Sequence, residues 1–483
     1  MDFEDLFKLL PLLLWALSRV IGRRRKGSET SGETPAAERA PSPQDLAQRG
    51  AAEVGELEAR GRAALGSLDE PSRRTFEAWL GERIGSLGAR RTRLAALAEA
   101  GDAELDEVVR VGAELDPDRT AIAALTDLAA RRRAAPSLQS VADALLDQLY
   151  SPLEPVVSER AAGPARPVSV VGADERLLRS PLRPALVAVP ASVGTRPWLW
   201  PLLGAELGRY LLAALPGFTG EIEEALELDT GGEALRPDSV ALAKLLFAAW
   251  SDQLVADLTA TSLFGSAWLE MMVREAGADG DAHAATGIGL DGRGGLLPRP
   301  PDHVRVLLAA HWLSSMGDES AALEWSRRWN DAHGDPASLH FPGSRAPGAI
   351  PLEPLASHLR RLVERFDSHA FRALGGSRFA GLPGLSDWNS LSGLARRAAR
   401  ELDAGTPARV PARALVAAAT SAAIAAPHRA AEIHAALADS LAGRARTPVA
   451  RPTPRAAPPR RTRLPRRVAE ALILSELVEP RAR

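Results

Sequence analysis

Apolar residues recur at spacings of three and four through most of this chain, and this periodicity limits it to a mainly helical fold. The pattern is clear in Phe76, Leu80, Ile84 and Leu87, which would lie on one face of a helix. Ala, Leu, Arg and Glu dominate the composition, and aromatic residues make up only 5% of it. This composition favours helices over sheets. We therefore expect a mainly α fold of the α+β type.

The size and charge of the chain narrow its class further. Its 483 residues are 46% hydrophobic and 25% charged, which is enough for a sizeable core. The formal net charge of −2 gives no global field that would attract nucleic acid. Cysteine is absent, which excludes disulfides, thiolate metal sites and cysteine nucleophiles.

The chain opens with an apolar segment, residues 1–22, followed by a flexible linker, 23–44. Its acidic start argues against a secretory signal. The apolar run 6–22, which carries Lys8 and Arg19 near its ends, is at the short limit for a spanning helix, roughly 17 residues. The basic cluster Arg23 to Lys26 would stay cytoplasmic. We expect a cytoplasmic protein attached to the inner face of the membrane through residues 6–26; docking of this helix on the protein itself or on a partner is the alternative.

Changes in composition divide the rest of the chain. Three or four helices are expected in the first part, and two short β-branched runs, 167–172 and 185–190, predict strands of a small sheet. The expected parts are a helical bundle (45–150), a helical domain with the small sheet (151–335), a C-terminal helical region (336–442), a basic Pro/Arg-rich disordered tail (443–466) and a short terminal helix (467–483).

The basic tail has two interpretations. It carries nine arginines and no Asp or Glu between Gly443 and Val468. Such a tail can bind anionic lipid or nucleic acid. The interpretation that we favour is a solvated disordered tail without a ligand.

Two apparent motifs do not carry a site. Residues 287–292 match G-x-G-x-x-G, but they follow a helix and lead into prolines, whereas the dinucleotide fingerprint must follow a strand and open a helix. His303 and His311 lie eight residues apart on one predicted helix, without a third ligand at zinc spacing. We therefore expect neither a nucleotide site nor a metal site from these residues.

Two short stretches on consecutive long helices are more informative. The sequence AELGR, 205–209, follows a predicted strand and lies in an apolar helix. The sequence QLVAD, 253–257, lies on a second apolar helix, 44 residues further along between Arg209 and Gln253. Each stretch places polar side chains one turn apart on a single helix face.

In this order and spacing the two stretches resemble the H-E-x-x-H and E-x-x-A-D elements of gluzincin-type zinc metallopeptidases. In that family two histidines and a glutamate hold zinc, and the glutamate between the histidines is the general base. The resemblance places Ala205 and Arg209 at the histidine positions and Gln253 at the glutamate ligand. Glu206 stands at the general-base position, and Asp257 at the position of the aspartate that orients a ligand histidine.

The resemblance covers about residues 165 to 330 and implies a degenerate metallopeptidase-like domain. A weaker match is Arg299-Pro300-Pro301 followed by Arg305, which resembles an H-P-P…R element of uncharacterised bacterial members. It places Arg299 at the third histidine position. An unrelated Ala/Leu-rich helical domain is the alternative.

The replaced positions do not suit zinc, which needs three protein ligands in a catalytic site. Ala205 has no donor atom, Arg209 is always cationic, and Gln253 offers only a neutral carbonyl. We expect no metal and no other cofactor. Glu206 and Asp257 would then need a new counter-charge, and we predict that Arg209 bonds Asp257, Glu206 or both.

Three functions follow from these features. We favour a non-catalytic, membrane-associated binding or scaffold protein whose partner is a protein or peptide, without a small-molecule cofactor and without nucleic acid. The second is a hydrolase that uses Glu206 and Asp257 as an acid/base pair without the usual zinc ligands. The third is a helical scaffold whose basic tail binds anionic lipid or nucleic acid.

Overall fold

The computed structural model describes residues 41–100, 104–161, 166–228, 240–279, 286–290, 296–334, 336–341 and 349–444. The apolar N-terminal segment, almost all of the linker that follows it and the C-terminal tail with its terminal helix lie outside these residues. The predictions for those segments therefore stay predictions.

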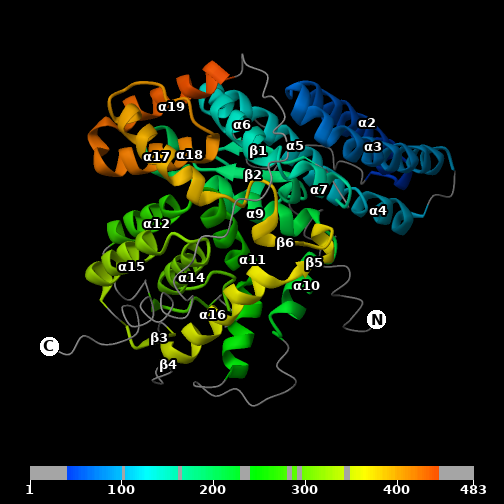
Figure 1. Cartoon of the computed structure of the whole chain (residues 1–483). Helices are drawn as coiled ribbons and strands as arrows, with labels where there is room; N and C mark the ends of the chain where they lie inside the picture. Colours follow the sequence, from blue (N-terminus) through cyan, green and yellow to red (C-terminus); the bar gives the residue numbers. More distant parts are fainter. Residues whose placement is uncertain are drawn as a thin grey trace, which may run out of the picture.

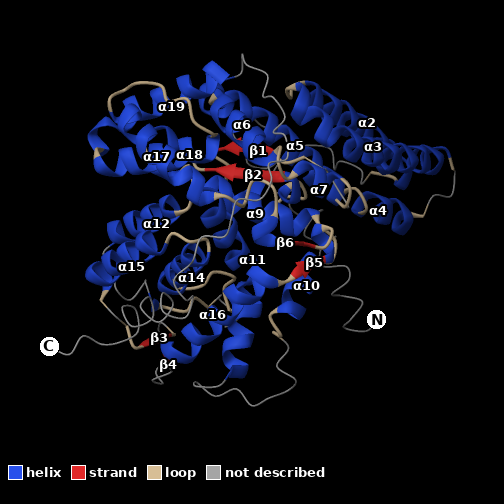
Figure 2. Cartoon of the chain, viewed as in Figure 1, coloured by secondary structure: helices blue, strands red, loops and turns tan. Residues whose placement is uncertain are grey.

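The described chain is mainly helical, as predicted (Figure 2). Its α-helices are α2 (Pro43–Gly66), α3 (Glu70–Glu99), α4 (Leu105–Ala113), α5 (Asp116–Ala134), α6 (Pro136–Tyr150), α7 (Glu154–Ser158), α8 (Glu175–Leu178), α9 (Leu202–Ala214), α10 (Phe218–Ala225), α11 (Val240–Phe264), α12 (Ser266–Asp279), α14 (Asp302–Ser315), α15 (Glu319–His333), α16 (Leu352–Ser368), α17 (Trp388–Asp403), α18 (Ala412–Ala425) and α19 (Ala430–Arg444).

The N-terminal bundle contains five helices, α2 to α6, where the sequence predicted three or four. The additional break is at Pro136, which begins α6. Proline cannot continue α5, because its ring would clash with the preceding turn, but it suits the first turn of a new helix. The first helix starts at a capping box, in which Ser42 and Asp45 accept from each other's backbone N–H groups.

The two predicted strands form a parallel pair, β1 (Val168–Val171) and β2 (Leu186–Val189). Four short strands were not predicted; they form two antiparallel pairs, β3 (Ser338–His340) with β4 (Ala349–Pro351) and β5 (Ala370–Phe371) with β6 (Ser377–Arg378). These strands are only two or three residues long, which is too short for an alternating pattern to show in the sequence.

The β1–β2 pair lies between two hydrophobic cores. Val168 and Val170 pack into the smaller core, with residues of α2 to α5. Val187 and Val189 pack into the larger core, which contains residues of α6 and of the helices from α9 onward. Figure 1 shows this arrangement, with α9 and α11 below the strands and α12, α14 and α16 around them.

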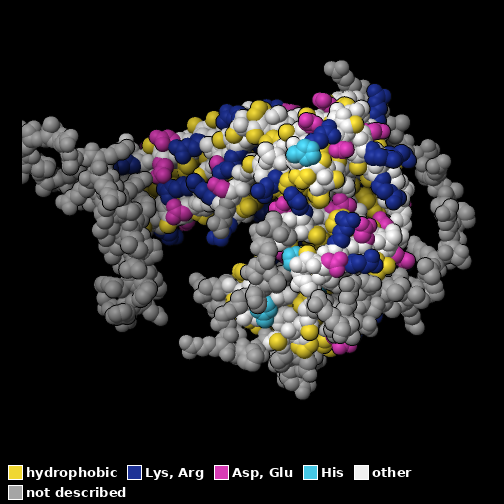
Figure 3. All heavy atoms as spheres, turned by 90° about the vertical axis from the view of Figure 1, so that its left-hand side faces the viewer, with side chains coloured by type: hydrophobic (Ala, Val, Ile, Leu, Met, Phe, Trp, Pro, Cys, Tyr) yellow, Lys and Arg dark blue, Asp and Glu magenta, His cyan; other side chains and the backbone are white. Residues whose placement is uncertain are grey.

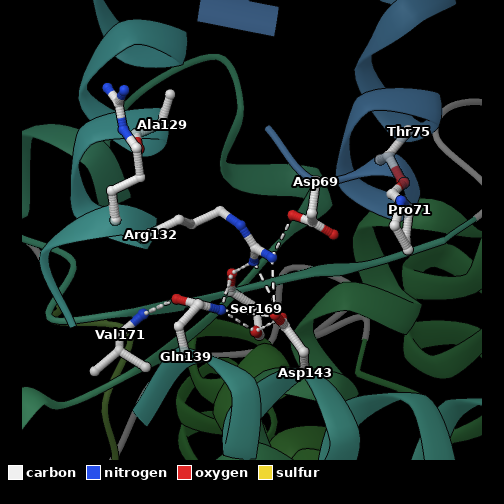
Figure 4. Close-up of polar contacts among 10 residues, drawn as sticks. Asp69, Pro71, Thr75, Ala129, Arg132, Gln139, Asp143, Ser169 and Val171 are labelled. Carbon is white, nitrogen blue, oxygen red and sulfur yellow. Dashed lines mark hydrogen bonds and ion pairs between the residues drawn. The ribbon is translucent and has the colours of Figure 1, made fainter. Parts of the chain in front are cut away.

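A polar cluster around the buried Arg132 joins the bundle to the strands (Figure 4). The guanidinium of Arg132 in α5 donates to Asp69 Oδ1 at 2.6 Å, to Asp143 Oδ2 at 2.8 Å and to the carbonyl oxygen of Ser169 at 2.6 Å. Gln139 in α6 donates to the same carbonyl oxygen at 3.1 Å and accepts from Val171 N at 3.2 Å. These contacts fix α3, α5, α6 and β1 relative to one another.

Candidate functional site

The two helices that carry the predicted site lie unusually close to each other. A Cβ atom on Gly208 of α9 would stand 2.9 Å from Ala256 Cα and 2.6 Å from Thr259 Oγ1 of α11. At Gly204, one turn earlier, it would stand 2.9 Å from Ala260 Cα. Glycine at both positions therefore permits a backbone approach that any side chain would prevent. This approach brings 205–209 beside 253–257.

Glu206 is held by two arginines. Arg209, one turn later on α9, donates through Nη1 to Glu206 Oε1. Arg183, which precedes β2, donates through Nη2 to Glu206 Oε2 at 2.7 Å and through Nη1 to the carbonyl oxygen of Leu186 at 2.8 Å. Both oxygens of a carboxylate that is only 13% exposed are thus paired with guanidinium groups.

Arg209 also links α9 to α11. Its Nη2 donates to Gln253 Oε1. The amide of Gln253 in turn donates through Nε2 to Asp257 Oδ1 at 2.7 Å. A glutamine four residues before an aspartate on one helix is well placed for this bond. The prediction for Arg209 is therefore confirmed for Glu206, while its link to Asp257 passes through Gln253.

Asp257 has a different arginine as its direct partner. Arg305 of α14 donates to both of its carboxylate oxygens, from Nε to Oδ2 and from Nη2 to Oδ1, each at 2.9 Å. The remaining Nη1 of Arg305 donates to Asp302 Oδ1 at 3.0 Å, and Arg299 donates to the same oxygen at 3.1 Å. The Asp257 side chain is fully buried, so this bidentate pair is what neutralises it.

The environment keeps Arg305 charged. Burial by itself lowers the pKa of this guanidinium, but the charges of Asp257 and Asp302 and the hydrogen bonds to them outweigh burial and raise it above its usual range. The guanidinium also lies over the ring of Trp268 in α12, 5.8 Å from its centre. Arg305 thus ties α11, α12 and α14 together.

The contacts form one continuous polar chain across three helices. In order, it runs through Arg183, Glu206, Arg209, Gln253, Asp257, Arg305, Asp302 and Arg299. Positive and negative groups alternate along it except at Gln253. The amide oxygen of Gln253 accepts from the cation Arg209, and its amide nitrogen donates to the anion Asp257. We call this set the Glu206–Asp257 chain.

This arrangement does not suit a zinc ion. Ala205 is buried and contributes only a methyl group. The guanidinium of Arg209 occupies the space between Glu206 and Gln253, and it already takes the amide oxygen that could face a metal. No group of three His, Cys, Asp or Glu side chains suited to a metal is present among the described residues. Arg299 is paired with Asp302 and is 66% exposed.

The two histidines of α14 and the G-x-G-x-x-G stretch lie in surroundings that indicate a structural role. His303 and His311 lie on α14, as predicted, and both are buried. His303 accepts from Trp329 Nε1 at 2.8 Å, and both ring nitrogens of His311 lack a hydrogen-bond partner within the described part of the chain. Of the G-x-G-x-x-G stretch, residues 287–290 are described; Gly287 forms a bridge to His340, and no helix begins there.

Sequence reasoning missed three residues of the chain of contacts, Arg183, Arg305 and Asp302. Arg305 was noted only as part of a weak motif, and its role for Asp257 could not be seen because 48 residues separate them. Arg183 gave no signal at all, since a single arginine before a strand is ordinary. The i, i+4 spacing of Gln253 and Asp257 was the one usable signal for the amide link.

Comparisons with protein-family models, with curated proteins and with solved structures found no match for this chain. The resemblance to gluzincin-type peptidases therefore stays a prediction from the sequence. Within the residues that the structure describes, none of the helices combines the length and apolar character needed to span a bilayer.

Proposed function

We propose that this chain is a non-catalytic binding or scaffold protein built on a degenerate peptidase-like domain. The observation that carries the proposal is the position of Arg209, whose guanidinium bonds Glu206 and Gln253 at once. In the resembling family the corresponding side chains would face a divalent cation. A fixed guanidinium there supplies positive charge without the Lewis acidity or activated water that hydrolysis needs.

The hydrolase alternative receives less support from the contacts. Both oxygens of Glu206 accept from guanidinium groups, and so do both oxygens of Asp257. A general base needs a free lone pair within reach of a substrate proton. Carboxylates held in this way by guanidinium groups suit a structural role.

Metal content and peptidase activity of the purified protein test the proposal directly. We expect less than stoichiometric zinc by elemental analysis, and no peptide hydrolysis above that of a Glu206→Gln variant. Stoichiometric zinc, or hydrolysis that the Glu206→Gln change abolishes, would overturn the proposal.

A designed variant tests the resemblance separately. The triple change Ala205→His, Arg209→His and Gln253→Glu restores the ligand set that the family uses, with both histidines at i and i+4 on α9. We expect this variant to bind one zinc ion, measured by calorimetry, while the wild type binds none. The double change that leaves Ala205 in place is the control, because it lacks one ligand. A folded triple variant without zinc affinity would count against the resemblance.

Attachment to membranes is a further part of the proposal. Residues 6–26 combine an apolar run with a basic cluster, which suits an anchor at the inner face of a membrane. We expect the full chain to sediment with anionic vesicles and a variant without residues 1–26 to stay in the supernatant. If loss of residues 443–483 abolishes binding instead, the basic tail is the membrane-binding element and the third function is correct.

A further inference from the structure

A second pocket lies away from the Glu206–Asp257 chain and shares no lining residue with it. It has a volume of about 710 Å³, which is in the range of small-molecule sites. It lies between α12, α15 and α18, with the segment that contains Arg196 and Trp198 on one side. Figure 3 shows the side of the molecule on which α12 and α15 lie, where charged side chains alternate with apolar ones.

Two arginine–tryptophan pairs line this pocket. The guanidinium of Arg274 lies over the ring of Trp198, 5.3 Å from its centre, and that of Arg328 lies over Trp325 at 4.4 Å. A guanidinium that lies over an indole is held in place by the ring while its N–H groups at the edge remain free to donate. The stacks therefore present directed donors to the pocket.

Arg274 is the cation whose charge is least compensated. Within the part of the chain that the structure describes, it has no ion-pair partner. Arg328 pairs with Glu324 at 2.5 Å on the outer side, and Arg196 lies 3.8 Å from Glu275, which also accepts from Trp198 Nε1 at 2.7 Å. Three guanidinium groups and two carboxylates, those of Glu270 and Glu275, line the pocket, and Glu324 outside the lining pairs with Arg328.

One of the two acids that line the pocket, Glu270, is held as part of its wall. It is buried and accepts from Ser421 Oγ at 2.6 Å and from Ser266 Oγ at 3.3 Å. Burial raises the pKa of Glu270 above its ordinary value, while the two hydroxyl groups work in the opposite direction.

We propose that this pocket binds a small molecule with an anionic head, a phosphate or carboxylate, on a flat apolar body. The head would accept from Arg274 and Arg328, and the body would lie against Val273, Ile424 and the indole edges. Guanidinium groups recognise both kinds of anion with paired hydrogen bonds. The site is independent of the proposed function, because it requires neither a metal nor the state of Glu206.

Three probes with the same phenyl ring test the charge that the pocket selects. Phenyl phosphate, benzyl alcohol and benzylamine share one aromatic body and differ in their polar head. We expect phenyl phosphate to bind at one site per chain, by calorimetry and by a change in tryptophan fluorescence, at least tenfold more tightly than the other two. Preferred binding of benzylamine, or no binding of phenyl phosphate at millimolar concentration, would overturn the proposal.

Variants locate the binding on the chain. Arg274→Ala should weaken phenyl phosphate at least tenfold, and Arg328→Ala should weaken it further. Glu270→Gln should leave affinity unchanged or improve it, because the amide keeps the shape and carries no charge. The matched control is Arg397→Ala on α17, an exposed arginine outside the pocket, which should change nothing.

The melting temperature of each variant shows that it is folded. Arg274 is exposed and has no ion pair within the described residues, so its removal should leave stability intact even if Arg328→Ala does not. Unchanged phenyl phosphate affinity in folded Arg274→Ala would show that the anion binds elsewhere. The same conclusion would follow if Arg397→Ala weakened binding equally.

Discussion

Asp257 is the residue on which the Glu206–Asp257 chain depends most, because its carboxylate is fully buried. Its charge is balanced by Arg305 and its hydrogen-bonding capacity is completed by the amide of Gln253. A buried ion pair of this kind adds little net stability by itself, but loss of one partner leaves an uncompensated buried charge. Asp257 and Arg305 therefore have to be retained or replaced together.

Arg305→Ala tests this dependence. We expect the free energy of unfolding to fall by about 3 to 5 kcal/mol, the usual cost of stranding one partner of a buried pair. Urea denaturation measures the change. The double variant Arg305→Ala with Asp257→Asn should recover a clear part of the loss, since the isosteric amide carries no charge. A double variant as unstable as the single one would show that packing of Arg305, and not charge, is responsible.

Arg209→Ala should have a smaller effect. Glu206 keeps Arg183 as a partner, and Arg209 is partly exposed, so its charge is screened by solvent. The main loss is the donor to the buried amide oxygen of Gln253, worth about 1 to 2 kcal/mol.

A lysine at position 209 distinguishes charge from geometry. It keeps the charge but not the forked donor, so Arg209→Lys should recover only part of the stability that Arg209→Ala loses. Full recovery in the same urea titrations would show that a positive charge alone is enough and that the link to Gln253 contributes nothing.

The sequence predicted the contact between Arg209 and Glu206 because both lie on one helix, one turn apart. It did not predict Arg305 as the partner of Asp257, or Arg183 as the second partner of Glu206. Those contacts join residues that are distant in the chain, and their formation depends on how the helices pack. Side-chain chemistry indicated that a counter-charge was needed, but not which element supplies it.

At the scale of elements, the spacing between α9 and α11 sets the geometry of the whole site. Gly204 and Gly208 lie one turn apart on α9, and each faces the backbone of α11. Small residues at this spacing allow helix axes to approach more closely than ordinary side chains permit. The two halves of the polar chain can meet only at this separation.

Gly208→Ala should therefore destabilise the protein, although alanine is the better helix former. The added methyl group would stand 2.6 Å from Thr259 Oγ1, and we expect a loss of about 1 to 3 kcal/mol from overpacking. Gly85→Ala on α3 is the control, because residue 85 is exposed and a Cβ atom there would have no neighbouring atom within 4 Å. It should be neutral or stabilising by up to about 1 kcal/mol. Equal effects at the two positions would contradict the close approach.

Element type was predictable wherever the apolar period was long. Both strands of the parallel pair were expected at nearly their observed bounds. Helix ends were less predictable. The start of α9 falls at Leu202 because a 3₁₀ turn, Pro197–Leu199, precedes it, and the end of α11 falls at Phe264 because Gly265 has φ +57°. Local backbone geometry of this kind leaves no periodic pattern.

At the scale of the whole molecule, both hydrophobic cores contain residues of the β1–β2 pair, so the two cores are joined through these strands. Alternate residues of these strands face opposite cores, as the period of two in a strand requires. The Arg132 cluster adds polar contacts across the same boundary. The sequence predicted a boundary between the helical bundle and the next part at residue 150. Helix α6 lies before that boundary, yet it packs into the larger core.

The larger core also makes the molecule sensitive to acid. Burial lowers the pKa of His303 and His311 to about 4, and it lowers that of His358 to about 4 together with the nearby Arg361, Lys244 and Arg365. All three are therefore neutral in the folded protein near neutral pH. An unfolded histidine titrates near 6.5, so the unfolded chain binds more protons between that pH and about 4.

Stability should therefore be highest above about pH 6.5 and should fall as the pH drops towards 4, by up to about 1.4 kcal/mol per pH unit for each histidine. Urea denaturation at a series of pH values measures the slope. His311→Phe should reduce it by about one histidine's share, because both ring nitrogens of His311 are buried without partners among the described residues, so burial opposes a second proton on the ring. His428→Gln, at an exposed position, should leave the slope unchanged. If His311→Phe leaves the slope as it is in the wild type, the acid sensitivity arises from the carboxylates instead.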